Sequence, residues 1–560
     1  MPCASWPDDN NSMVDHISQD VQILIIDEQS LAQSYLKFAL EKLGYQQINV
    51  ADRAQDAIQL CKTRQYDLII CAHNLQKGKD GFQLYEELKA RGLQKLSTGF
   101  IFISADTDPS LVYSVIELQP DEFLAKPFVI GDLEVRIERV LKRKQRLKPI
   151  YQLLDNGQPD RALDVVNTEL AKSANSAFYP LLLKLKGDLL LQLKQHDAAE
   201  QFFNAMLDIQ PFPWARIGLA RTLLLQHKDA QALTLLQQLS RRPETKLEAL
   251  DCMAELEFRQ QQFDVAQQHL EQAAHLAPRN LLRQQKLLQL SRINHDYETQ
   301  YHAAKSMVKF SRHSMHEQPD LYLNMARAGI DFALTLEQDD EQSLRLSRQI
   351  NQCLSSIRQQ FADNRKDFQQ EVIQARLFYL KDNKDKAQQL LKDLQEQVPD
   401  DDSIEDALDR AKALHEVGLS DAANKLFRHI SLRCQQEGAD PVFSTYLQQE
   451  QQERASMPYG ARELNNNAVH LYQHGNWQEA FKAFELALRV MPKSAAIALN
   501  LLQTILSAPR RPSINSSQQE TLILRCLDII ERGKLNPEQF KRYQKLKEKH
   551  PDRFGTPAAD

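Results

Sequence analysis

The first quarter of the chain alternates short apolar runs with amphipathic stretches. Apolar runs typical of strands buried on both faces of a parallel sheet occur at 21–26, 48–51, 68–71, 99–103 and 122–124. Apolar residues recur at helical spacing in the segments between and after them, at 31–43, 54–64, 82–91, 108–118 and 130–147. Five strands alternating with five helices predict a doubly wound α/β sheet. In such a sheet, functional residues gather at the carboxyl ends of the strands, where the strand order reverses.

The remainder of the chain is predicted to be all-α and carries an internal repeat. The clearest copies span 183–211, 250–278 and 464–492. The copy at 464–492 has small residues, large residues and a closing proline at fixed positions: Leu464, Ala468, Leu471, Gly475, Trp477, Ala480, Phe484, Ala487 and Pro492. This spacing, with copies about 34 residues apart, resembles the tetratricopeptide (TPR) repeat. The resemblance implies helix pairs that cross closely at small residues and stack into an α-solenoid with a concave groove.

These patterns divide the chain into successive segments. The boundaries that we expect are a disordered leader at 1–20, an α/β domain at 21–148, TPR repeats at 149–506, a loop at 507–519, capping helices at 520–550 and a tail at 551–560. No Gly/Ser-rich linker follows the α/β domain, so its last helix is expected to continue through the basic run at 140–148. That run favours a solvated helix face, with Leu141 and Leu147 turned inward, over a site for an anionic partner.

Polar residues follow the predicted strands of the α/β domain. Asp27 and Glu28 follow the first strand, Ser104 ends the fourth, and Lys126 follows the fifth in a Lys-Pro-Phe sequence. In this order they resemble the receiver (CheY-like) domain of two-component response regulators. The resemblance implies that the acidic pair holds Mg²⁺, that Ser104 and Lys126 contact a phosphoryl group, and that Phe123 is an aromatic switch residue. Phe123 is equally compatible with a core position.

The third strand departs from that family pattern. A receiver carries its phospho-acceptor aspartate at the end of this strand, whereas here the position falls on Ala72 when counted forward from Asp67. Counting backward from Asp80 gives His73, but the loop resembles a subgroup with one extra residue, which favours Ala72. Neither residue supplies the carboxylate nucleophile that acyl-phosphate formation requires.

The loss of that carboxylate also weakens the expected metal site. Asp27 and Glu28 would hold Mg²⁺ weakly at most, because Mg²⁺ usually needs further oxygen ligands to give up its hydration shell. Two other roles stay open for these residues. The acidic pair could cap the following helix, where negative charge suits the helix dipole. Lys126 could simply form an ion pair with Asp27.

Composition narrows the class of function. A net charge of -6 and a pI near 6.2 argue against a nucleic-acid footprint over the whole chain, and no apolar run is long enough to span a bilayer. Seven scattered cysteines without a CxxC pair fit a reducing cytoplasm. The sequence lacks P-loop, GxSxG, HExxH and cyclic-dinucleotide signatures, so we expect no enzymatic centre and no cofactor beyond weak Mg²⁺.

The predicted function is therefore that of a non-enzymatic two-component (phosphorelay) signalling protein, a pseudo-receiver coupled to a TPR scaffold. Its expected partners are proteins, for example a histidine kinase, bound by the receiver and by the TPR groove. Groove candidates are Lys184, Lys186, Arg216, Arg221, Asn465, Asn466 and His470. The alternative is a transcriptional regulator that binds nucleic acid through the basic C-terminal region at 535–550.

Overall fold

The computed structural model describes residues 20–75, 78–172, 177–336, 341–364, 366–394, 402–438, 440–455, 461–507, 516–533 and 535–551. The expected leader and tail fall outside these ranges except for Asp20 and Pro551. The chain divides into two compact units, which are described separately. The first comprises residues 1–283 and 310–317, and the second comprises residues 284–309 and 318–560.

The first unit begins with a five-stranded parallel sheet in the order β2-β1-β3-β4-β5. Its strands are β1 (Gln22–Ile26), β2 (Gln47–Ala51), β3 (Leu68–Ala72), β4 (Gly99–Ser104) and β5 (Glu122–Ala125). The helices between them are α1 (Ser30–Lys42), α2 (Ala54–Thr63), α3 (Gly81–Ala90) and α4 (Pro109–Glu117), followed by α5 (Ile130–Asp155). The α/β prediction is confirmed, and the strand order reverses between β1 and β3.

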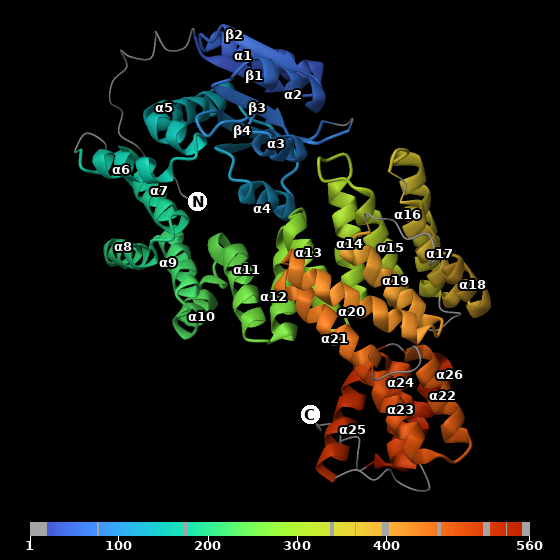
Figure 1. Ribbon diagram of the computed structural model, residues 1–560. Helices are drawn as coiled ribbons and strands as arrows, with labels where there is room; N and C mark the ends of the chain where they lie inside the picture. Colours follow the sequence, from blue (N-terminus) through green and yellow to red (C-terminus); the bar gives the residue numbers. More distant parts are fainter. Residues whose placement is uncertain are drawn as a thin grey trace. The chain divides into compact units, whose positions relative to one another are not determined.

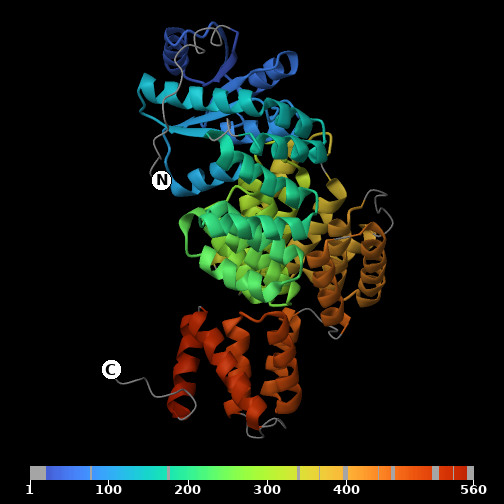
Figure 2. The same ribbon diagram turned by 90° about the vertical axis from the view of Figure 1, so that its left-hand side faces the viewer.

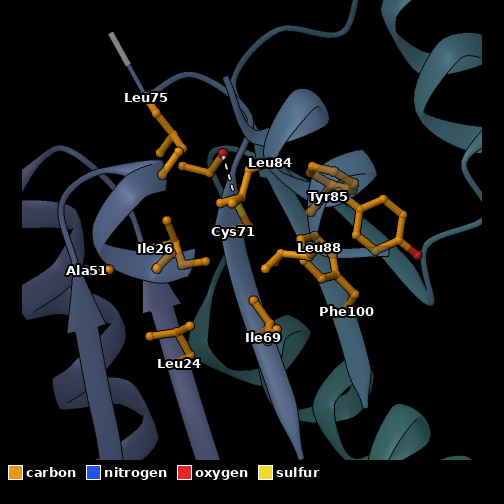
Figure 3. Close-up of a cluster of buried hydrophobic side chains, with 14 of the residues drawn as sticks. Leu24, Ile26, Ala51, Ile69, Cys71, Leu75, Leu84, Tyr85, Leu88 and Phe100 are labelled. Atoms are coloured by element: carbon orange, nitrogen blue, oxygen red, sulfur yellow. Dashed lines mark hydrogen bonds between the residues drawn. The ribbon is translucent and has the colours of Figure 1, made fainter. Parts of the chain in front are cut away.

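The core lies on both faces of this sheet, because successive side chains of a strand point to opposite faces. Leu24 and Ile69 belong to the cluster that packs against α3, where Leu84 and Leu88 are also buried (Figure 3). Ile23 and other alternate residues belong to the opposite cluster with α1 and α5. Burial on both faces explains why the strands are continuous apolar runs in the sequence.

Helix α5 leads from the sheet into the repeats without a break and contains Pro149. Leu147 is buried, as expected for the inward face. Lys142, Arg146 and Lys148 are exposed, as expected for a solvated face, whereas Arg143 and Lys144 are partly buried and form ion pairs with Asp121.

Seven further helices follow α5 in the first unit, and each packs against the next along the chain (Figures 1 and 2). They are α6 (Pro159–Leu170), α7 (Tyr179–Gln192), α8 (His196–Ile209), α9 (Pro213–Leu225), α10 (Asp229–Leu239), α11 (Pro243–Arg259) and α12 (Phe263–Leu276). Phe203 of α8 fills the space between α7 and α9. A Cβ atom added to Gly187 or Gly218 would lie 2.6 Å or 2.3 Å from its ring. Glycine is therefore required at both positions for this packing.

The second unit is entirely helical over its described residues. Helix α13 (Leu281–Ile293) begins three residues before the unit boundary. The helices that follow are α14 (Tyr297–Ser311), α15 (Pro319–Ala333), α16 (Glu341–Gln360), α17 (Asp367–Leu380), α18 (Lys384–Leu394), α19 (Ile404–Glu416), α20 (Ser420–Glu437), α21 (Pro441–Ala455), α22 (Ala461–Gln473), α23 (Trp477–Val490), α24 (Ala495–Ser507), α25 (Ser516–Arg532) and α26 (Pro537–Lys549). The α-rich part of the chain thus continues through the second unit, as expected for an all-α segment.

The C-terminal helices α25 and α26 both pack against α24. Tyr543 and Leu546 of α26 are buried in one cluster with Ile505 of α24 and Cys526 of α25. Helix α25 begins within the segment 507–519 that we expected to be a loop, of which residues 508–515 lie outside the described ranges. No helix of the described residues combines the length and apolarity needed to cross a membrane.

Candidate functional site

The strand register brings the predicted site residues to one edge of the sheet. Ile26 of β1 pairs with Cys71 of β3, so Asp27 and Ala72 come next on adjacent strands. Ala72 pairs with Ile103 of β4, which Ser104 follows. Because the strands are parallel, their carboxyl ends meet at this edge, at the point where the strand order reverses.

Asp27 and Lys126 form an ion pair at this edge. The Nζ atom of Lys126 lies 3.0 Å from Oδ2 of Asp27, whose side chain is 3% exposed. The other carboxylate oxygen, Oδ1, accepts a hydrogen bond of 2.9 Å from the backbone N–H of Gln29. The backbone N–H of Lys126 donates to the carbonyl oxygen of Ser104 at 2.7 Å. The charge of Asp27 is therefore neutralised without any added cation, and both partners are held in place.

Ser104 also orients the loop that follows β4. Its hydroxyl oxygen accepts a hydrogen bond of 3.0 Å from the backbone N–H of Asp106, and its side chain is buried. Phe123 lies on β5 and packs, partly buried, against the core cluster on the α3 face of the sheet.

Ala72 is the last residue of β3 and presents only a methyl group at the edge. Its carbonyl oxygen lies so close to the start of α3 that a Cβ atom on Gly81 would be 2.3 Å from it. His73 follows as a buried residue, with its backbone N–H donating to the carbonyl of Ile103 at 2.8 Å. Burial lowers the pKa of His73, so its imidazole is neutral near pH 7.

The described residues at this edge do not form a metal-ligand cluster. Over the described ranges, no group of three or more His, Cys, Asp or Glu residues is arranged to hold a metal ion. Asp27 already forms an ion pair with Lys126, and Glu28, the next residue along the chain, is half-buried. Any Mg²⁺ site here would have to compete with the lysine for the same carboxylate.

The turn between α12 and α13, together with the first residues of α13, contacts the α/β domain within the first unit. Arg283 forms ion pairs with Glu117 of α4 at 2.5 Å and with Asp251 of α11 at 2.7 Å, and its side chain is 2% exposed. Arg279 forms an ion pair of 2.6 Å with Asp80, which caps the N-terminus of α3. Sequence reasoning missed this contact, because isolated arginines in a helical repeat give no signal of their partner.

This junction perturbs one carboxyl group. Burial, together with the nearby charges of Asp80 and Glu117, raises the pKa of Glu86 to about 7, although Arg279 partly offsets the effect. Glu86 therefore titrates near neutral pH. Its ionisation places a further negative charge at the contact between the repeats and the sheet domain.

The expected groove residues lie in different surroundings. Arg221 forms an ion pair with Glu248, Lys186 lies over the ring of Phe202, and the Nδ2 group of Asn500 donates to Oδ1 of Asn465. His470 stacks on His474 with ring centroids 3.9 Å apart. The others are at least partly accessible: Lys184, Arg216 and Asn466. The first four candidates, Lys184, Lys186, Arg216 and Arg221, belong to the first unit, whereas Asn465, Asn466 and His470 belong to the second.

Comparison with known families matches both the α/β domain and the helices that follow it. Residues 23–138 match the family described as response regulator receiver domain, and residues 151–212 match the tetratricopeptide repeat. Residues 23–138 form a response regulator receiver domain. TPR helices follow it.

The receiver domain is similar to proteins of two-component signalling. It is 29% identical over 124 residues to the probable chemotaxis protein CheY of Rhizobium etli, a match that covers 22% of this chain and 95% of that protein. A match to the transcriptional activator protein IrlR of Burkholderia pseudomallei is 28% identical over 180 residues and covers 30% of this chain and 73% of IrlR. The KDP operon transcriptional regulatory protein KdpE of Escherichia coli is 30% identical over 121 residues, 22% of this chain and 51% of KdpE.

Among solved structures, the receiver domain protein (CheY-like) of Methanospirillum hungatei JF-1 is 20% identical and has a TM-score of 0.21. That match covers 22% of this chain and 97% of the other protein.

Proposed function

We propose that this protein is a non-enzymatic signal-transduction protein of a two-component pathway, in which a pseudo-receiver is coupled to a TPR scaffold that binds and regulates protein partners. The observation that carries the proposal is the position of Ala72. It ends β3 between Asp27 and Ser104, where a phosphorylatable receiver would present a carboxylate. A methyl group there cannot accept a phosphoryl group.

The surrounding contacts favour a preset conformation over a switch. Lys126 is paired with Asp27, and both are fixed by backbone hydrogen bonds. Arg283 joins α4 of the receiver to the repeats through a largely buried ion pair. Rearrangement of α4 would break this pair, and Arg283 would keep only Asp251 of α11 as its charge partner. Information would then enter through protein contacts, for example with a histidine kinase, and not through phosphorylation of this chain.

Cellular location is part of the same proposal. The six cysteines of the described ranges are buried free thiols, which supports a reducing cytoplasm.

The test is labelling of the full chain by acetyl phosphate in the presence of Mg²⁺. The wild-type chain should take up no acyl-phosphate, whereas Ala72→Asp should gain Mg²⁺-dependent labelling, because Asp27, Ser104 and Lys126 are in register. Ala72→Asn, which has a similar shape without the charge, is the matched control and should stay unlabelled. An acyl-phosphate on residues 66–81 of the wild-type chain would refute the proposal.

Transcriptional regulation through the basic C-terminal region remains the second candidate. Helix α26 carries five basic residues, Lys541, Arg542, Lys545, Lys547 and Lys549, but its opposite face is buried through Tyr543 and Leu546. Strongly salt-dependent DNA binding in a gel-shift assay, lost when Lys545 and Lys549 are changed to Gln, would favour it.

A further inference from the structure

Helix α19 of the second unit is buried around its whole circumference. Every residue from 406 to 416 is buried, including the ionisable side chains Asp406, Asp409, Arg410, Lys412, His415 and Glu416. A helix with this sequence on a protein surface would leave its polar face in water. Its charged groups must therefore be satisfied inside the unit.

Three arginines, one from each of the helices α13, α15 and α17, satisfy the carboxylates of α19. We call Arg292, Arg327 and Arg376 the arginine ladder; their side chains are at most 4% exposed. Arg292 pairs with Glu405 at 2.7 Å, Arg327 pairs with Asp406, and Arg376 pairs with Asp409 at 2.7 Å and with Glu416 at 2.5 Å. Removing α19 would leave Arg327 and Arg376 buried without these carboxylates, so α19 is a permanent part of the core.

Helix α21 lies against the same groups in a different way. The ring of Tyr446 contacts two cations, with its centroid 5.4 Å from the guanidinium of Arg292 and 5.5 Å from Nζ of Lys412. One turn later, Oε1 of Glu450 lies 3.6 Å from the same lysine Nζ. Oε1 of Glu453 lies 2.9 Å from Nε2 of His295.

Hydrogen bonds complete this contact. The Nε2 group of Gln449 donates to the carbonyl oxygen of Ile293 at 3.1 Å. Nη1 of Arg454 lies 3.2 Å from Nδ1 of His415. We call the surface that receives α21 the α21 seat; it consists of Arg292, Ile293, His295, Lys412 and His415.

The cations of the seat do not depend on α21 for charge compensation. Arg292 also pairs with Glu405, and Lys412 also pairs with Asp331 at 3.0 Å. On the helix, Glu450 accepts from Arg454 at 2.6 Å and from the hydroxyl of Tyr446 at 3.0 Å. Both surfaces keep a charge partner when they separate, so the electrostatic cost of releasing α21 is lower than that of releasing α19. The apolar burial of Phe443, Tyr446 and Leu447 is what holds α21 in place.

We propose that the α21 seat is a docking surface for a partner helix and that α21 is its resident occupant in the same chain. The partner is an acidic amphipathic helix that carries an aromatic residue at position i and carboxylates at positions i+4 and i+7. This is the spacing of Tyr446, Glu450 and Glu453 in α21. That spacing places all three on one helix face, where they meet two cations and a histidine. The inference deepens the proposed function by giving the chemistry of the partner, and it rests on that function for the existence of a partner.

The experiment uses the full chain and a fluorescent peptide with the sequence of residues 440–455, with binding followed by anisotropy. In the wild-type chain α21 competes with the peptide for the seat. The apparent affinity for the peptide is therefore low, because the seat is open in only a small fraction of the chains. Tyr446→Ala weakens the resident helix but leaves the seat unchanged, so this chain should bind the peptide at least tenfold more tightly. Gln448→Ala, an exposed position of α21, is the matched control and should behave as wild type.

Two further measurements keep the result decisive. A peptide with the charge of Glu450 reversed to lysine should not bind either chain. Hydrogen exchange over residues 404–416 should be unchanged in both Tyr446→Ala and Glu453→Ala, because α19 is held by the arginine ladder.

Equal peptide binding by the wild-type and Tyr446→Ala chains, or binding by neither, would overturn the proposal. Loss of α19 protection in both variants would also overturn it, since α21 would then belong to the permanent core. None of these substitutions touches the receiver pocket. Acyl-phosphate labelling of the wild-type receiver would therefore contradict the proposed function while the peptide result stayed interpretable.

Discussion

Substitution of Arg376 by methionine tests the electrostatic core of the second unit. Its guanidinium donates four hydrogen bonds to carboxylates: to Glu416 at 2.9 Å and 2.5 Å, to Asp409 at 2.7 Å and to Asp331 at 2.8 Å. All these side chains are buried. Methionine has a similar reach and fills much of the same space, so the substitution mainly removes the charge.

The expected loss is smaller than the sum of the four bonds. Asp331 keeps Lys412 at 3.0 Å, and Asp409 keeps Nε of Arg327 at 3.4 Å. Glu416 loses both of its bonds to the guanidinium. We therefore expect the free energy of unfolding of the second unit to fall by about 3–5 kcal/mol, the cost of breaking one buried pair, and not by three times that amount.

Hydrogen-exchange mass spectrometry of the full chain measures this loss locally, because unfolding of a chain with two units is not a single transition. Exchange in α17 and α19 should accelerate by more than a hundredfold, while β1 and β3 stay unchanged. The control is Arg348→Met, the same chemical change at an exposed position of α16, which should cost less than about 0.5 kcal/mol. A loss below about 1 kcal/mol for Arg376→Met, or one equal to the control, would refute the claim that the guanidinium of Arg376 stabilises this buried cluster of carboxylates.

Three other predictions concern the first unit. Gly218→Ala places a Cβ atom 2.3 Å from the ring of Phe203 and should destabilise this unit by about 1–3 kcal/mol, seen as a lower melting temperature in calorimetry. Because the pKa of Glu86 is raised from 4.5 to about 7, its ionisation costs stability as the pH rises through that interval. Glu86→Gln should therefore raise the melting temperature at pH 8 and leave it unchanged at pH 4, and the reverse order would contradict the raised pKa. Arg283→Met removes the ion pair with partly exposed Glu117. Hydrogen exchange in α4 should then become roughly 5–30-fold faster, which corresponds to a loss of about one or two kcal/mol of local stability. Unchanged exchange would mean that the contact does not restrain α4.

Sequence patterns were sufficient to locate two kinds of element: those with one apolar face, and those that are apolar on every buried face. The five strands match their predicted ranges within one residue at each end, because runs such as Leu68–Ala72 are apolar on both faces. The pairing of Asp27 with Lys126 could be foreseen as one option, since parallel strands bring both residues to the same edge. Helix α5 extends further than its predicted range because Pro149 does not end it.

Long-range charge pairing could not be foreseen in the same way. The charged residues of α19 recur as they would on a solvated helix, and nothing in their spacing distinguishes a partner on α17 from water. The same holds for Arg279 and Arg283, whose partners on the receiver lie 199 and 166 residues away. Periodicity predicts which face of a helix is apolar, but it carries no information about which distant helix covers the polar face.

Within the first unit, the helices α6 to α12 are joined to the receiver domain at two points: by the unbroken helix α5 at one end and by Arg283, at the start of α13, at the other. An ordinary solenoid is open at its far end, so evolution or engineering can add or delete whole repeats and change only its length. Here the helices from α6 to α12 form an arch of fixed span. Deleting one repeat would move Arg283 away from Glu117. Inserting a single residue into α5 would do the same, because it would rotate the helices after the insertion by about 100°. The number of repeats in this arch is therefore a constraint on the receiver itself, and homologous chains that keep the arginine contact should keep the arch at the same length.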